Sequence, residues 1–173
     1  DDDDVWIQTK LERQINFLKE NNYDLVNSQM FLFRENINQV YKIQKNKSIK
    51  SIDDLLRVNQ INTSTVFLRK SELVFFDENN VLVSIEDYAL WIKLLINGYS
   101  FGFINEPLTY YRVLDNYSKN NWKTKHLRII YLLIQIKVSH PEIEILMSLS
   151  NHLVKYITKG FFTKITSHRK ISI

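Results

Sequence analysis

Helix-forming and strand-forming segments alternate along residues 5–113, and this alternation restricts the fold more than any other feature. In some stretches apolar residues recur every three or four positions, as Leu11, Ile15 and Leu18 do, which is typical of a helix that buries one face. Other stretches are rich in β-branched and aromatic residues, which indicates strands. The expected helices span 5–21, a short segment after 51 and 86–97; the expected strands span 23–33, 61–71, 99–104 and 108–113, with loops at 42–50 and 75–84. This alternation predicts an α/β fold.

Local signals mark the ends of two of these helices. Ser51 is followed three residues later by Asp54, an acidic variant of the capping box, so we expect a helix to begin there. Gly98 follows the helix 86–97, and a glycine in the left-handed conformation is a common helix stop.

The composition is that of a folded globular chain, and it excludes several kinds of site. The chain has 173 residues, the size of one ordinary domain, and 45% of them are hydrophobic. It contains no cysteine, which excludes disulfides and thiolate sites. The longest purely apolar run, 129–134, is far shorter than the ~20 residues that a membrane-spanning helix needs, so we expect no integral segment.

The charges are divided unevenly between two parts of the chain. Residues 1–118 carry 13 Lys and Arg against 17 Asp and Glu, whereas residues 119–173 carry 10 against 2. The first part is therefore acidic, which argues against nucleic acid as its partner. The second part has a helical pattern from Trp122 onward and is rich in Ile and Leu. Two interpretations of 122–173 stay open: its helices cover the core, or they contact an anionic membrane surface.

Two acidic clusters are the chemical candidates. Asp1, Asp3 and Asp4 belong to the run DDDD at the start of the chain, and Glu86 and Asp87 are adjacent at the start of the expected helix. Both have simple explanations. An acidic start can be solvated or a tag remnant, and an acidic first turn stabilises a helix by roughly 0.3–1 kcal/mol through the helix dipole. A cap needs only one carboxylate, so the second carboxylate at 86–87 needs another explanation.

Several motifs follow the acidic start in a characteristic order. After DDDDVW come YDLVNS, INTSTVFLRKS, EDYALWIKLLINGY and INEPLTYYRV. This series resembles the second half of the inverting, nucleotide-sugar-dependent glycosyltransferases with the GT-A fold. The resemblance covers roughly residues 1–118 and implies that they form the C-terminal, metal and acceptor side of a Rossmann-like GT-A domain. Residues 119–173 would then be a basic helical appendage.

The resemblance implies a role for each acidic residue. Asp1 and Asp3 map onto the Asp-x-Asp motif that holds a divalent cation, Mn²⁺ or Mg²⁺, on the donor diphosphate, with Asp4 adjacent. Asp87 maps onto the catalytic base, and Glu86 helps to shape the site. The chemistry agrees with these roles, because hard cations prefer oxygen ligands and neutralise a diphosphate that carboxylates would repel. A positioned carboxylate that accepts the proton of a sugar hydroxyl contributes roughly 10²- to 10⁴-fold.

The implied activity is transfer of a sugar from a nucleotide-diphosphate donor to a glycan or lipid-linked acceptor, with inversion. Such transfer belongs to polysaccharide, O-antigen or lipooligosaccharide synthesis in the cytoplasm, at the inner face of the membrane. We expect no nucleic-acid partner. The alternative from a different class is a non-catalytic interaction or scaffold domain built on a truncated GT-A fold.

The chain departs from the family pattern in two ways. Many members carry a His two residues after the Tyr-Arg of the final strand, whereas this chain has Leu114, which leaves the third metal ligand open. The first half of the family's domain, which holds the nucleotide base and ribose, is absent from these residues. Because the chain does not begin with Met, we expect a fragment of a longer transferase, with a shortened relative as the alternative.

Three further residues have both a functional and a structural interpretation. Arg112 can contact donor phosphate through a bidentate pair, or be a surface ion-pair partner at a strand end. Ser64, within INTST, can line the acceptor cleft, although alternate residues of a strand must also face the core. Trp6 can stack on a sugar ring beside the metal loop, or pack against the protein.

Overall fold

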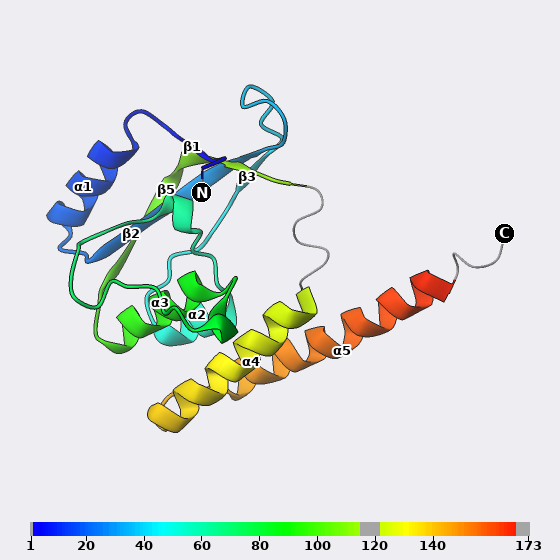
Figure 1. Ribbon diagram of the computed structural model, residues 1–173. Coiled ribbons are helices and arrows are strands. Elements are labelled where there is room, and N and C mark those ends of the chain that lie inside the picture. Colours follow the sequence, from blue (N-terminus) through cyan, green and yellow to red (C-terminus); the bar gives the residue numbers. More distant parts are fainter. Residues whose placement is uncertain (1, 115–121, 169–173) are drawn as a thin grey trace. The chain divides into compact units, whose positions relative to one another are not determined.

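A computed structural model of the chain describes residues 2–114 and 122–168, with side chains for all of these except 122 and 159–168 (Figure 1). The chain divides into two compact units. Unit 1 comprises Asp1–Asp77 and Asp87–Asp115, and unit 2 comprises Glu78–Glu86 and Asn116–Ile173. None of the helices in the described ranges combines the length and the apolar character required to cross a lipid bilayer.

Unit 1 is built on a five-stranded mixed sheet. The strand order is β1 (Val5–Trp6), β5 (Phe101–Arg112), β2 (Leu25–Phe33) and β3 (Lys42–Gln44), and β4 (Phe67–Leu68) pairs with the beginning of β2. The long central pair, β2 and β5, is parallel, and the other pairs are antiparallel. Strands and helices therefore combine as the alternating pattern predicts, and the α/β class is confirmed.

The parallel pair contains an irregularity near its middle. Ser28 lies opposite Ile104, but two residues later Met30 lies opposite Thr109, so β5 holds three more residues than β2 over this stretch. Pro107 lies within the irregular part and has no N–H to donate to a ladder. Beyond it the regular pairing resumes and brings Arg112 beside Phe33, at the carboxyl ends of both strands.

Three helices and one short turn complete unit 1. They are α1 (Lys10–Glu20), α2 (Ile52–Arg57), α3 (Glu86–Ile96), whose first residue belongs to unit 2, and the 3₁₀ turn η1 (Thr63–Thr65). In Figure 1, α1 lies alongside the sheet, and it packs against β2 and β5. The buried polar residue Gln14 of α1 donates hydrogen bonds from its Nε2 to the carbonyl oxygens of Val26 (3.3 Å) and Thr65 (2.8 Å). This side chain therefore links the helix, the sheet and η1.

The two local helix signals are confirmed. The Ser51 side chain accepts a hydrogen bond from the Asp54 N–H, and the Asp54 carboxylate accepts one from the Ser51 N–H, which is a complete capping box. The Lys50 N–H also donates a hydrogen bond to the Asp54 carboxylate (3.0 Å). The hydrogen bonds to this carboxylate lower the pKa of Asp54, and the bond from Lys50 has the largest effect. Gly98 has φ +80°, a conformation that a residue with a side chain rarely adopts, and α3 ends just before it.

Two expected boundaries at the edges of the sheet are wrong. The segment 5–21 does not form one helix, because Val5 and Trp6 pair with Tyr110 and Thr109 of β5, and α1 begins only at Lys10. A β-branched and an aromatic residue suit such an edge strand. The expected loop 42–50 begins with β3, whose residues pair with 30–32 of β2 in a hairpin. Both strands form through pairing with distant residues, which a local pattern does not show.

Three other expectations need correction. The segment 61–71 is not one strand, because the Asn62 side chain accepts a hydrogen bond from the Ser64 N–H and bends the chain into η1 before the short β4. The expected strands 99–104 and 108–113 form the single strand β5, which passes through Asn-Glu-Pro as an irregularity and not as a turn. The expected loop 75–84 contains the 3₁₀ turn η2 (Asn80–Leu82).

Unit 2 consists mainly of two helices, as its sequence pattern predicts. α4 (Trp122–Ser139) and α5 (Leu146–His168) lie side by side (Figure 1). η2 also packs against α4, and the Arg128 guanidinium donates a hydrogen bond to the carbonyl oxygen of Val83. The buried side of α4 carries Ile129, Leu133 and Ile136.

A histidine pair between α4 and α5 predicts a pH dependence of stability. The Nδ1 atoms of His126 and His152 lie 2.9 Å apart. Burial, then the charges of His126, Lys155 and Lys125, lower the pKa of His152 to about 4. The unfolded chain, in which this pKa is about 6.5, binds the proton first on acidification. The contribution of His152 to the free energy of unfolding is therefore present above pH ~6.5 and is lost as the pH falls toward ~4.

Thermal unfolding at several pH values would measure this contribution. We expect the unfolding free energy of the unchanged chain to fall more steeply between pH ~6.5 and ~4 than that of His152→Gln. His140→Gln is the matched control, because the His140 side chain is 38% exposed and lies 3.4 Å from the Glu142 carboxylate. Parallel curves for the unchanged chain and His152→Gln would contradict the assignment.

Candidate active site

The turn η1 and its capping residue Asn62 connect the segments that carry the candidate residues. The Thr63 hydroxyl donates a hydrogen bond to the Asp87 carboxylate at the start of α3 (3.3 Å). The Ser64 hydroxyl donates one to the Asp4 carboxylate in the loop before β1. On the other side, the Thr109 hydroxyl of β5 donates to the carbonyl oxygen of Ser64 (3.2 Å). A turn of three residues thus ties the two acidic clusters to each other and to the sheet.

Asp4 is held by protein groups on both of its oxygens. Oδ2 accepts the hydrogen bond from Ser64, and Oδ1 accepts one from the backbone N–H of Arg112 (2.9 Å). Hydrogen bonds to a carboxylate are stronger than those between neutral groups, so they fix the loop to η1 and to the end of β5. Asp4 therefore acts in this structure as an anchor of the acidic loop.

Arg112 is engaged with the same loop. Its Nε donates a hydrogen bond to the carbonyl oxygen of Asp3 (3.2 Å), and its Nη1 donates one to the carbonyl oxygen of Arg34 (3.1 Å). The guanidinium carbon lies 4.7 Å from the ring centre of Phe33, close enough for a cation–π contact. These contacts fix the guanidinium at the carboxyl ends of β2 and β5, beside Asp3.

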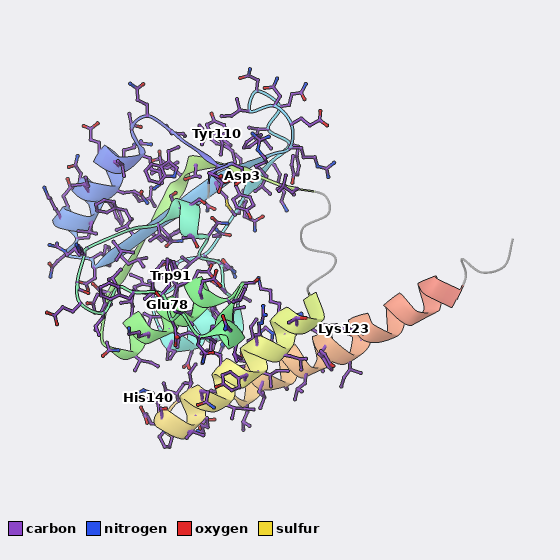
Figure 2. All side chains as sticks on the ribbon, viewed as in Figure 1. Asp3, Glu78, Trp91, Tyr110, Lys123 and His140 are labelled. Carbon is purple, nitrogen blue, oxygen red and sulfur yellow. The ribbon has the colours of Figure 1, made fainter. Side chains whose placement is uncertain are left out.

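Asp3 differs from Asp4 in the hydrogen bonding of its carboxylate. In the described part of the chain, no protein donor forms a hydrogen bond with its carboxylate. Figure 2 shows Asp3 on the same side of unit 1 as Tyr110, near the end of β5. Its carboxylate oxygens are therefore available to a ligand, which is what a metal-binding aspartate requires. The expected partner ligand, Asp1, lies outside the described residues.

Whether these residues can hold a divalent cation depends on the number and type of ligand atoms that they offer. Among residues 2–114 and 122–168, no group of three or more His, Cys, Asp or Glu residues lies together as a metal site. A Mg²⁺ or Mn²⁺ ion does not require one, because it is often held by one or two carboxylates together with water and substrate phosphate. Asp3 supplies such a carboxylate, so the donor set fits. Leu114, where a His ligand is common in the family, is exposed.

Asp87 lies at the first turn of α3, as predicted. Its Oδ2 accepts the hydrogen bond from Thr63, and its Oδ1 accepts one from the N–H of Tyr88 (2.7 Å). The neighbouring Glu86 has a buried Oε2 atom without a hydrogen-bond partner in the described residues. A buried carboxylate oxygen without a donor is costly, so the two adjacent acids are in different environments.

Tyr111 is a site residue that the sequence did not single out. Burial raises the pKa of its hydroxyl, and the negative charges of Asp4, Asp3 and Asp87 raise it further. A side-chain hydrogen bond from Asn62 acts in the opposite direction. The phenol therefore stays protonated among three carboxylates. Side chains alternate along a strand, so Thr109 and Tyr111 share one face of β5, the face that η1 covers.

Trp6 is more than half exposed and is steadied from one side. The Lys10 ammonium lies 4.1 Å from the centre of its ring, in a cation–π contact. Lys10 itself is fully buried and donates a long hydrogen bond to the carbonyl oxygen of Val66 (3.4 Å). Burial lowers the pKa of Lys10 to about 8. The free face of Trp6 can therefore contact a ligand while the ring stays in place.

A surface hollow of about 640 Å³ opens beside the carboxyl ends of β2 and β5. It is lined by residues that follow Phe33 and Arg112 in the sequence: Arg34, Glu35, Gln39, Tyr41, Val113 and Leu114. The Arg34 guanidinium lies 5.4 Å from the Tyr41 ring centre. The hollow combines an aromatic face, aliphatic groups and planar polar groups.

Comparison with known proteins identifies relatives over part of their length. No protein-family model matches the chain. It is 28% identical over 124 residues to the putative teichuronic acid biosynthesis glycosyltransferase TuaG of Bacillus subtilis, and 29% identical over 132 residues to the uncharacterized glycosyltransferase MJ1057 of Methanocaldococcus jannaschii. These alignments cover 71% and 72% of this chain but 49% and 45% of the relatives. The chain thus spans about half the length of the curated relatives it matches.

The fold is shared with solved structures of TarS from S. aureus. The crystal structure of S. aureus TarS 1–349 matches with a TM-score of 0.54 at 14% identity, and covers 99% of this chain and 48% of that one. The TarS 1–349 complex with UDP-GlcNAc matches with a TM-score of 0.53 at 13% identity over 92% of this chain and 46% of that one. The resemblance to GT-A type glycosyltransferases that the sequence motifs indicate is therefore confirmed, over about half the length of such a protein.

Proposed function

We propose that this chain forms the metal and acceptor side of an inverting glycosyltransferase that uses a nucleotide-sugar donor. One observation carries the proposal: the turn η1 is hydrogen bonded both to Asp87 and to the acidic loop that holds Asp3. Binding of UDP-GlcNAc and UDP by TarS, which has the same fold, supports a nucleotide-sugar donor.

Asp87 is the proposed general base. A sugar hydroxyl is a weak nucleophile until a positioned carboxylate accepts its proton. The hydrogen bonds from Thr63 and from the Tyr88 N–H hold the orientation of this carboxylate. The acceptor oxygen attacks the anomeric carbon from the face opposite the leaving diphosphate, its proton passes to Asp87, and the configuration inverts.

Asp3, with Asp1, is the proposed ligand of a divalent cation, Mn²⁺ or Mg²⁺. When bound, such an ion neutralises the charge that develops on the leaving diphosphate. Asp4, Ser64 and Arg112 hold the backbone around Asp3 in position. The Tyr111 hydroxyl, which stays protonated, could donate a hydrogen bond to an oxygen of the diphosphate when a bound cation offsets the charge of these carboxylates.

The acceptor is a glycan or a lipid-linked sugar, and we place it at the hollow beside Arg112 and at the exposed face of Trp6. The Tyr41 ring offers an apolar face to a sugar, and Glu35 and Gln39 offer partners to its hydroxyls. We place the reaction in the cytoplasm at the inner face of the membrane, where a lipid-linked acceptor is presented. The rival proposal is a non-catalytic interaction domain on the same half-fold.

Calorimetry on the protein, in the full length that its gene encodes, separates the two proposals. A transferase should bind a UDP-, GDP- or dTDP-sugar in the presence of Mn²⁺, and chelation should weaken this binding. The matched control is the same titration with the free sugar, which lacks the diphosphate and should bind far more weakly. Absence of binding to every nucleotide sugar, with and without Mn²⁺, would favour the interaction domain.

A further inference from the structure

One side of α4 carries large apolar residues that face solvent. Leu127, Tyr131, Ile134 and Val138 follow each other at spacings of four, three and four residues, which places them in one line along the helix. We call these four residues the α4 stripe; they are exposed by 47%, 39%, 46% and 73%. The buried side of the same helix carries Ile129, Leu133 and Ile136. Within the part of unit 2 that the structure describes, packing of α4 therefore leaves the stripe exposed.

The neighbouring helix repeats this feature. The exposed apolar residues in the described part of α5 are Leu146, Met147, Leu153, Val154 and Ile157. Single exposed apolar residues are common on soluble proteins, whereas many of them on two adjacent helices mark an interaction surface. This surface belongs to unit 2, whereas the proposed base Asp87 and the acidic loop belong to unit 1.

The charges on these two helices identify the kind of partner. The sequences of α4 and α5 contain seven Lys and Arg residues and neither Asp nor Glu. Lys123 lies one turn before Leu127, which places it on the same side of α4 as the stripe, and it is exposed. A partner must therefore offer both an apolar phase and negative charge. An anionic lipid bilayer offers both.

We propose that the α4 stripe, with the exposed apolar residues of α5 and the flanking lysines, binds the surface of an anionic bilayer. α4 lies in the plane of the membrane, with the stripe at the boundary of head groups and acyl chains. A second copy of the chain fits less well, because it would bring cations of α4 against cations of its partner without an acidic residue of either helix between them. The inference rests on unit 2 alone and does not require transfer chemistry.

Flotation with lipid vesicles tests this surface directly. The full chain is mixed with vesicles of phosphatidylcholine containing phosphatidylglycerol, or of phosphatidylcholine alone, at low and at high salt. We expect it to float with the anionic vesicles at low salt, to be largely released at high salt, and not to float with the neutral ones. Leu127→Gln with Ile134→Gln should lower the ratio of bound to free protein at least about tenfold.

A matched double variant controls for the loss of two apolar side chains. Val58 and Phe76, in unit 1, are exposed to a degree similar to Leu127 and Ile134. Val58→Gln with Phe76→Gln should float like the unchanged chain, and circular dichroism should show that both double variants keep their helices. Equal loss in the two double variants, or failure of the unchanged chain to float with anionic vesicles, would overturn the proposal. A dimer in solution that only the α4 variant dissociates, without vesicle binding, would assign the surface to a second copy and also overturn it.

Discussion

Replacement of Asp87 by Asn should abolish most sugar transfer by the intact protein while leaving its fold in place. Asn has the size and shape of Asp, so α3 should still form, and the Thr63 hydroxyl can still donate a hydrogen bond to the remaining carbonyl oxygen. The amide cannot accept the acceptor's proton, so we expect turnover to fall by roughly 10²-fold or more. Turnover at saturating donor and acceptor measures this effect.

The control for Asp87→Asn is the same change at another helix start. Asp53 lies in the first turn of α2, is exposed, and has no place in the proposed site. Asp53→Asn should change turnover less than twofold, while thermal unfolding of both variants should stay close to that of the unchanged protein. Near-normal turnover of Asp87→Asn would remove Asp87 from the role of base.

Asp3→Ala should weaken donor binding and turnover together, and chelation should do the same to the unchanged protein. A cation that joins the protein to the diphosphate contributes to both steps, so we expect roughly a 10²-fold loss or more in turnover. Activity in EDTA should return when Mn²⁺ or Mg²⁺ is added in excess. Donor affinity with and without the metal, followed by calorimetry, separates a binding effect from a purely catalytic one.

The adjacent residue provides the control for Asp3→Ala. Asp2 is exposed, and Asp2→Ala removes the same group one position away. It should leave metal-dependent donor binding within a few-fold of normal. Full transfer in the presence of chelator would show that the metal assignment is wrong, and Leu114 in place of a His ligand would then be the sequence feature that indicated it.

Features of the fold that depend on neighbouring residues were predictable from the sequence. The Ser51 and Asp54 capping box and the Gly98 helix stop each involve contacts within a few residues, so residue type alone identifies them. The strand Val5–Trp6 depends on Tyr110 and Thr109, more than a hundred residues away, and the periodicity of α1 concealed it. Pairing of this kind is set by tertiary structure and leaves only a weak local pattern.

The candidate site was predictable in part, for a different reason. The positions of Asp3 and Asp87 followed from a resemblance to a family, because no spacing in one sequence shows that Asp87 and the loop that holds Asp3, more than eighty residues apart, connect to the same turn. Tyr111 was missed because its importance depends on what covers β5. Thr109 and Tyr111 are two residues apart in a strand, so both side chains lie on one face, but only the structure shows that η1 lies across that face.

The irregularity in β5 makes the length of this strand critical. With regular pairing after Ser28 and Ile104, Phe33 would lie opposite Thr109, and Tyr111 and Arg112 would extend past the end of β2. The three extra residues draw them back beside Leu32 and Phe33. Because side chains alternate from face to face, deletion of a single residue here would turn Tyr111 away from η1. Insertions and deletions around Pro107 should therefore be tolerated far less than point substitutions at the same positions.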